Sequence, residues 1–199
     1  MIDEKALIQV LKELEPEKSP HKKAEHIHRI FNVKCVCGRD RLVIIPKDDE
    51  IVYKVGYTEQ GKHACYREVF RYHHSDGAKR FLAESSCLYD EEFYLEKQKR
   101  ATTYYHFWEQ HPFDLTWDER FMLSIDKVEE LEYMQDPVFA LLKNNATDWF
   151  TRLAYEQESD IKNLRDFLKK WEIEDLYTPN IGFLSAEEGY LPIIFDYAD

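Results

Sequence analysis

The chain lacks a long hydrophobic run. No stretch of its 199 residues approaches the roughly eighteen consecutive apolar positions that a membrane-spanning helix needs. The N-terminus also lacks the apolar segment behind a basic start that marks a secretory signal peptide. We therefore expect a soluble, cytoplasmic protein that has no membrane partner.

Cysteine is scarce, with 4 residues in the whole chain. These cysteines do not form the paired C-x-x-C ligands of a zinc site, and a chain of this length needs no disulfide to stabilise its core. We interpret all of them as reduced thiols.

Basic residues are scarce in the second half of the chain. Residues 1–100 hold 19 Lys or Arg and 18 Asp or Glu, whereas residues 101–199 hold 8 and 21. This excess of acid argues against nucleic acid as a partner, because such binding depends mostly on Lys and Arg against phosphate. Two explanations of the acidic half stay open: a cationic partner, or an acidic face that keeps the protein in solution.

Apolar periodicity predicts helices first and a sheet afterwards. A first helix is expected behind Asp3 as its cap, and a second is expected through Phe31, opened by Ser19 and Pro20. The period then changes to two, and five segments are predicted to form one antiparallel sheet: 33–37, 41–45, 51–57, 80–90 and 92–98. A further helix is expected over 61–74, between the third and fourth of these strands.

The chain after Ala101 is predicted to be helical and rich in core aromatics. Apolar residues recur at spacings of three and four over 121–134 and 138–157. A last helix is expected to begin at Ser159, its cap, and to lead directly to Asp175.

The segment from Asp175 to the end of the chain has polar residues at a spacing that suits phosphoryl transfer. Asn180 follows Asp175 by five positions, and the apolar run 191–195 ends at a second acid, Asp196. One acid can orient or deprotonate a hydroxyl group, while an Asn oxygen and a second carboxylate hold Mg²⁺ against the phosphates of a nucleotide.

In this segment the sequence resembles the protein-kinase-like superfamily, including its small-molecule branch. The run D-L-Y-T-P-N at 175–180 matches the catalytic-loop pattern D-L-x-x-x-N, and D-Y-A at 196–198 lies where the family has D-F-G. Lys54 in I-V-Y-K-V resembles the lysine of the family's V-A-I-K, and Glu68 follows it by fourteen positions on the expected helix.

The resemblance implies a role for each of these residues. Lys54 would contact the nucleotide phosphates and pair with Glu68, while Asp175 would act as the base or orienting group. Asn180 and Asp196 would bind Mg²⁺.

The resemblance also implies where ATP binds. The segment 94–98 lies where the family has its hinge, so Glu96 and Gln98 would contact adenine through their backbone groups. The turn after the first strand has only Gly38, whereas the family has several glycines there to let backbone N–H groups approach phosphate. Phosphate binding would then depend on side chains such as Arg39 or Arg41.

We therefore expect an α+β, two-lobed protein-kinase-like fold with a five-stranded antiparallel N-lobe and a reduced helical C-lobe. The expected divisions are an N-terminal helical extension at 1–31, the N-lobe at 32–100 and the shortened C-lobe at 101–199. The C-lobe is expected to be reduced because the chain ends three residues after Asp196.

The expected function is ATP- and Mg²⁺-dependent phosphoryl transfer to an unknown acceptor. One alternative is a catalytically inactive kinase-like module that acts by binding a protein partner. Another is a helix-and-sheet interaction protein whose likeness to kinases is accidental. Exposed edges of a shortened lobe would also be compatible with a homo- or hetero-oligomer.

Overall fold

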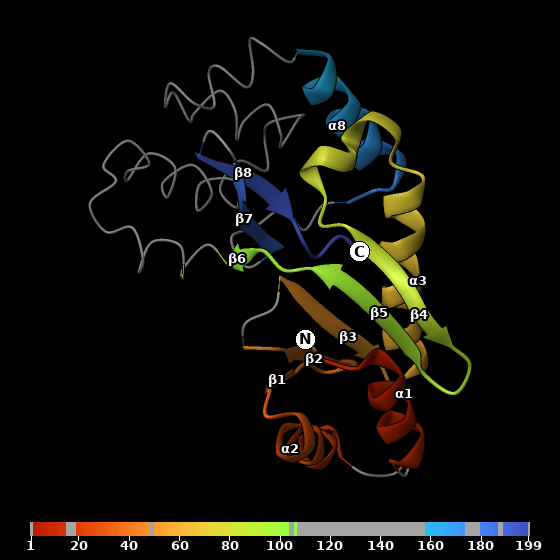
Figure 1. Ribbon diagram of the computed structural model, residues 1–199. Helices are drawn as coiled ribbons and strands as arrows, with labels where there is room; N and C mark the ends of the chain where they lie inside the picture. Colours follow the sequence, from red (N-terminus) through yellow and green to blue (C-terminus); the bar gives the residue numbers. More distant parts are fainter. Residues whose placement is uncertain are drawn as a thin grey trace. The chain divides into compact units, whose positions relative to one another are not determined.

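The computed structural model describes residues 2–14, 19–47, 50–103, 106, 158–173, 180–186 and 189–198. The chain divides into two compact units. The first, here called the N-terminal unit, contains residues 1–73 and 83–100, and the second, the C-terminal unit, contains residues 74–82 and 101–197. The fold is α+β, with a five-stranded antiparallel sheet in the N-terminal unit (Figure 1).

Two capped helices open the N-terminal unit. Helix α1 spans Glu4–Glu13, and the Asp3 carboxylate accepts hydrogen bonds from the backbone N–H groups of the first turn. Helix α2 spans Pro20–Phe31, with Ser19 as its N-cap. Both caps were predicted from the sequence and are confirmed, because a short polar side chain before a helix satisfies otherwise unpaired N–H groups.

The sheet follows directly after α2. Its strands are β1 (Lys34–Cys37), β2 (Arg41–Ile45), β3 (Ile51–Gly56), β4 (Ser85–Asp90) and β5 (Tyr94–Lys99). Their order is β1-β2-β3-β5-β4, every neighbouring pair is antiparallel, and α3 (Glu59–His73) connects β3 toward β4. The predicted sheet of five antiparallel strands is confirmed.

The strand predicted over 80–90 is wrong in its first part. Residues Asp76–Phe81 form a 3-10 helix, η1, and β4 begins only at Ser85. Asp76 has a positive φ of 44° and is followed by Gly77. These two residues favour a turn, so the chain forms a short helix here although the apolar residues that follow alternate as in a strand.

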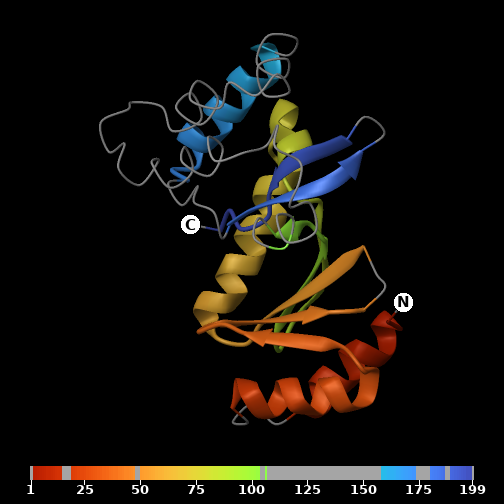
Figure 2. The same cartoon turned by 90° about the vertical axis from the view of Figure 1, so that its left-hand side faces the viewer.

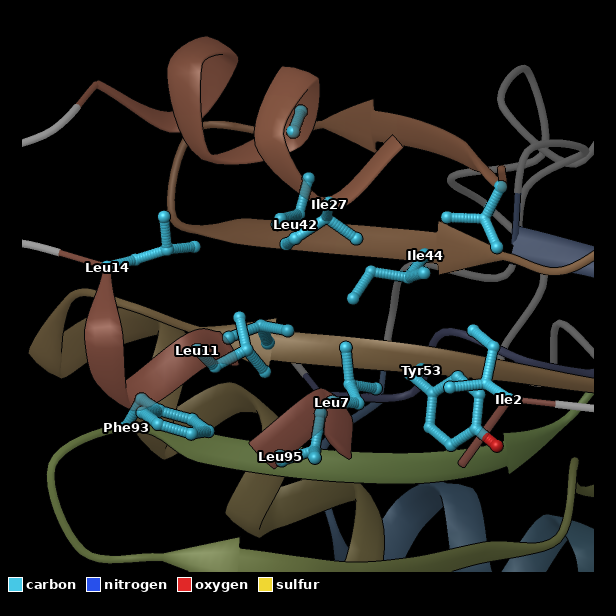
Figure 3. Close-up of a cluster of buried hydrophobic side chains, with 13 residues drawn as sticks. Ile2, Leu7, Leu11, Leu14, Ile27, Leu42, Ile44, Tyr53, Phe93 and Leu95 are labelled. Atoms are coloured by element: carbon cyan, nitrogen blue, oxygen red, sulfur yellow. The ribbon is translucent and has the colours of Figure 1, made fainter. Parts of the chain in front are cut away.

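The two faces of the sheet are covered by different helices (Figure 2). On one face, strand side chains at alternate positions pack with α1 and α2 into a single apolar core (Figure 3). Its fully buried members include Leu7, Ile27, Leu42, Ile44, Tyr53 and Leu95. Helices α1 and α2 complete this core, so residues 1–31 lie in the same compact unit as the sheet. Helix α3 packs on the opposite face.

A close backbone approach joins the start of α3 to the turn between β1 and β2. A Cβ atom placed on Gly61 would lie 2.0 Å from the carbonyl oxygen of Asp40. Thr58 strengthens this junction, since its Oγ1 donates to the Asp40 carboxylate at 3.0 Å and accepts from the Gly61 N–H at 3.0 Å. Only a residue without a side chain fits at Gly61.

The C-terminal unit has its own small sheet. Strands β6 (Thr102–Thr103), β7 (Ile181–Ala186) and β8 (Gly189–Ile194) are antiparallel and lie in that order. Helix α8 (Glu158–Lys170) packs against η1 within this unit. The helices predicted over 121–134 and 138–157 lie outside the described residues. Across the described part of the chain, no helix is both long and apolar enough to cross a membrane.

We predict that Gly61→Ala lowers the free energy of unfolding by about 1–3 kcal/mol, the usual cost of forcing extra volume into a packed site. Helix propensity alone predicts the opposite sign, because alanine is favoured over glycine in a helix by about 1 kcal/mol. Gly38→Ala is the matched control, since its Cβ would lie 3.3 Å from the nearest backbone atom. Equal unfolding midpoints for Gly61→Ala and the wild type in a denaturant titration would contradict the close approach.

Candidate functional site

Polar side chains are buried together between the sheet and α3. We call them the α3 cluster; its members are Arg41, Lys54, Glu68, Ser85, Glu96 and Gln98. Alternation along the strands explains why they meet, because the neighbours of these strand residues, such as Leu42 and Leu95, point into the apolar core on the other face. The sheet therefore has one apolar face and one face with concentrated charge.

Glu68 of α3 is the centre of the cluster. Its side chain is 0% exposed, and one carboxylate oxygen, Oε1, accepts from the Arg41 guanidinium. The other oxygen, Oε2, accepts from the Lys54 ammonium and, at 3.1 Å, from the Gln98 side-chain amide. Both oxygens of this buried carboxylate are thus paired with donors, two of which are cationic, as burial of a charge requires.

Lys54 lies in the middle of the sheet and is 5% exposed. In the strand register it is flanked by Val43 of β2 and Glu96 of β5. The pairing of Lys54 with Glu68 was expected from the family resemblance, and the two side chains form an ion pair in the structure. Their roles toward a nucleotide stay predictions.

The hinge role expected for Glu96 and Gln98 requires correction. Both lie inside β5, which is hydrogen-bonded to β3 on one side and to β4 on the other. Their backbone groups belong to the sheet ladders, so they are not presented to adenine as those of a hinge would be. Their side chains instead belong to the α3 cluster, where the Gln98 amide donates to Ser85 Oγ at 3.0 Å and to Glu96 Oε1 at 3.3 Å.

Glu96 is the second acid of the cluster and is fully buried. Within the part of the chain that the structure describes, its Oε2 atom has no hydrogen-bond partner. Burial, followed by the charge of nearby Glu68, raises the pKa of Glu96 from its ordinary value of 4.5 to about 8. Lys54, Ser85 and Arg41 act in the opposite direction but do not compensate. Burial therefore favours the neutral, protonated form of Glu96.

Arg41 and Arg39, the expected helpers in phosphate binding, are placed differently from each other. Arg41 is 19% exposed and its guanidinium is already paired with Glu68. Arg39 is 95% exposed at the turn between β1 and β2, where it makes a long contact of 3.8 Å to the adjacent Asp40 carboxylate. Arg41 is thus in the cluster, whereas Arg39 lies on the surface of the turn.

The turn between β1 and β2 is held down onto the chain that follows β3. The Tyr57 hydroxyl lies 2.8 Å from the carbonyl oxygens of both Gly38 and Arg39 and can donate to them. The Gly38 N–H is used within the turn, where it donates to the Arg41 carbonyl at 2.8 Å. In this arrangement the Gly38 N–H is already paired and is not directed toward a phosphate.

An apolar strip lies beside the cluster on the same face of the sheet. It consists of Val36 of β1, Val43 and Ile45 of β2, and Val52 of β3, which alternate with residues of the apolar core. Val36 is 44% exposed and pairs with Val43, which in turn pairs with Lys54. Val43 and Ile45 are half-buried and Val52 is buried, so the exposed part of the strip is at Val36.

The two residues expected to bind Mg²⁺ flank the open end of the β7–β8 hairpin. The Phe195 N–H donates to the carbonyl oxygen of Asn180 at 3.0 Å, directly before Asp196. The hairpin therefore brings the Asn180 and Asp196 positions to one end of the small sheet. No cluster of three or more His, Cys, Asp or Glu side chains suited to a metal occurs in the described residues, and Mg²⁺ binding stays a prediction.

Two parts of the expected site stay untested. Asp175 lies outside the described residues. Lys54 and Asp196 belong to different units, so their expected proximity also stays a prediction.

Comparison with known proteins gives no assignment, since no family model, curated protein or solved structure matches the chain.

Sequence reasoning missed the side-chain roles of Ser85 and Glu96. The signal for Glu96 was present in β5, where Glu96 and Gln98 alternate with Leu95 and so share the face of the sheet that carries Lys54. Ser85 had no comparable signal, because its place depends on where β4 begins.

We predict that stability falls as pH rises from about 5 to about 8, with a slope near 1.4 kcal/mol per pH unit attributable to Glu96. In this range the folded protein keeps a proton on Glu96 that the unfolded chain has lost, so raising the pH favours unfolding. The stabilising contribution is complete below the unfolded pKa and is lost as pH rises through the folded pKa.

Glu96→Gln, which imitates the neutral acid, should remove this slope. Denaturant titrations at several pH values give the free energy of unfolding of the wild type and of Glu96→Gln. The difference between the two values isolates the contribution of Glu96 from that of the other titrating groups. Parallel stability curves would contradict a neutral buried Glu96. Glu92→Gln, at an exposed position on the neighbouring turn, controls for the loss of a carboxylate.

Proposed function

We propose that the chain binds a nucleoside triphosphate with Mg²⁺ on the sheet face that carries Lys54, and transfers its terminal phosphoryl group in the manner of a small, two-lobed protein-kinase-like fold. The observation that carries the proposal is the buried ion pair between Lys54 of β3 and Glu68 of α3. An ammonium group held in a fixed place by a carboxylate is suited to bind phosphate oxygens and stabilise the charge that develops during transfer.

The surroundings of the ion pair support a nucleotide as the ligand. The apolar strip formed by Val36, Val43, Ile45 and Val52 lies on the same face as Lys54 and would contact a base. Ligand sites of this kind combine a mostly apolar lining with a few placed polar groups. The lysine would hold the phosphates while the strip covers the base.

The β7–β8 hairpin supplies the oxygen ligands that the reaction needs. Asn180 and Asp196 lie at one end of this hairpin, and amide and carboxylate oxygens are the ligands that Mg²⁺ prefers. The metal would bridge phosphate oxygens and neutralise their charge. Asp175 would orient the acceptor hydroxyl and receive its proton.

A second candidate is an inactive kinase-like module that binds a protein partner. The turn between β1 and β2 favours it, because this turn has one glycine and is tied down by the Tyr57 hydroxyl. Such a turn offers phosphate fewer backbone N–H groups than a glycine-rich loop does. The acceptor of an active enzyme, or the partner of an inactive module, is not identified by these residues.

We predict that ATP raises the melting temperature of the wild type, and more strongly with Mg²⁺ than without it. At a hundredfold excess over Kd, one occupied site stabilises the protein by about 2.7 kcal/mol. Asp196→Ala should remove the Mg²⁺-dependent part of this shift and leave the fold intact, because a metal-binding carboxylate at a hairpin end contributes little to stability. Equal shifts for wild type and Asp196→Ala in a thermal titration would show that Asp196 takes no part in metal binding.

We predict that Asp175→Asn binds ATP and Mg²⁺ about as well as the wild type but loses roughly 10²-fold or more in turnover. The substitution keeps the size of the side chain and removes the charge that orients or accepts the hydroxyl proton. Transfer of labelled γ-phosphate to a broad panel of acceptors, and to water, measures the difference. A wild type that binds ATP but shows no transfer or hydrolysis above Asp175→Asn would defeat the enzyme proposal and favour the binding module.

A further inference from the structure

Two of the cysteines lie two positions apart on β1 and share one face of the sheet. Cys35 is paired in register with Ile44, and Cys37 is paired with Leu42; both partners are fully buried in the apolar core. The two cysteines themselves are half-buried at the rim of this core, on the face of the sheet opposite to Lys54. The proposed reaction makes no use of them.

The two thiols lie close enough to influence each other. Burial, followed by the charge of Cys37, raises the pKa of Cys35 from its ordinary value of 9.0 to about 11, and burial also raises the pKa of Cys37. Neither forms a disulfide. Both thiols therefore keep their protons near neutral pH, and a protonated thiol is a poor nucleophile toward disulfides and oxidants.

The spacing of the pair disfavours a disulfide and suits a bridging ion. Residues two apart on one strand are separated by about 6.6 Å, whereas the Cβ atoms of a disulfide lie only about 3.5–4.5 Å apart. A metal ion that lies in line between two sulfur atoms, about 2.3 Å from each, holds these atoms about 4.6 Å apart. The remaining difference of about 2 Å is covered when both Cβ–Sγ bonds lean toward the ion.

We propose that Cys35 and Cys37 form a two-coordinate site for a soft monovalent cation such as Cu(I), which is held in line between the two sulfur atoms. Thiolates select soft ions, and Cu(I) accepts two of them without the four ligands that structural Zn²⁺ takes. On binding, two S–H bonds break, two S–Cu bonds form and two protons leave to solvent, so the step needs no oxidant or reductant. This site goes beyond the proposed function and does not depend on it.

The surroundings of the pair suit the charge of the product. Two thiolates and one Cu(I) ion carry one negative charge together. Lys23 of α2 places its ammonium nitrogen 5.7 Å from the centroid of the Tyr57 ring. Burial, followed by the charge of Cys37, raises the pKa of the Tyr57 hydroxyl, so Tyr57 and Cys37 are neighbours. Because α2 packs on the core face of β1, this ammonium lies on the same side of the sheet as the two thiols and favours an anionic complex there.

The experiment offers Cu(I) to the reduced full-length chain under anaerobic conditions, with bicinchoninate as a coloured competing chelator. Wild type, Cys35→Ser and Cys37→Ser are compared with the control Cys87→Ser, which removes an exposed thiol on β4. We expect wild type and Cys87→Ser to take one Cu(I) ion per chain from the chelator. Cys35→Ser and Cys37→Ser should each bind about 10²-fold more weakly or worse, since loss of an outer-shell partner of a metal ligand alone costs about 10–100-fold.

A second measurement uses the wild type alone and so does not depend on the folding of a serine variant. Cu(I) should protect Cys35 and Cys37 from alkylation, located by mass spectrometry, while exposed Cys87 is alkylated at an unchanged rate. Equal Cu(I) uptake by all four proteins, or one ion per two chains, would overturn the proposal. Unchanged alkylation of Cys35 and Cys37 in the presence of the ion would overturn it as well. Neither measurement involves ATP, so its outcome is independent of the proposed function.

Discussion

The buried carboxylate of Glu68 is the constraint on which the N-terminal unit depends. A charge at 0% exposure is tolerated only where donors and opposite charges surround it. Here the donors come from three strands, because Arg41 belongs to β2, Lys54 to β3 and Gln98 to β5. These strands must therefore be adjacent and in one register, since a slip of one residue would turn each side chain to the other face of the sheet. Because Glu68 belongs to α3, the same bonds also hold this helix against the sheet. The position of the helix and the register of the strands therefore depend on one carboxylate.

The two faces of the sheet divide stability and chemistry between them. The face under α1 and α2 is a continuous apolar core, in which residues such as Leu42 and Leu95 are almost completely buried (Figure 3). Burial of such side chains contributes about 1.5–3 kcal/mol each. The α3 face contributes less, because desolvation of its charges offsets much of their mutual attraction. A sheet stabilised from one side can thus keep a polar, partly unsatisfied cluster on the other.

Much of the N-terminal unit could be predicted from the sequence, because its signals are local. Caps at Asp3 and Ser19 and the alternation of strand residues depend on neighbours in the chain. The contact between Arg41 and Glu68 could not be predicted, since it joins residues 27 apart and depends on the sheet order. The role of Glu96 was misassigned because it was inferred from its position along the chain, which matches that of the family hinge. The contacts of its side chain depend instead on which face of β5 it occupies. For Asp175, the spacing to Asn180 predicts a catalytic role. Spacing along the chain does not predict where the Asp175 side chain lies in space.

The turn between β1 and β2 has one glycine, and cationic side chains lie in the neighbouring strands. A loop rich in backbone N–H groups attracts phosphate with dipoles that do not titrate, so its affinity does not depend on pH. In this chain the turn is held by Tyr57 and Thr58, and positive charge near the strip comes from side chains within the strands. Glu68 accepts from both Arg41 and Lys54, whereas the buried Glu96 is the cross-strand neighbour of Lys54. Positive charge on this face of the sheet is therefore carried by side chains of the α3 cluster and not by backbone N–H groups of the turn.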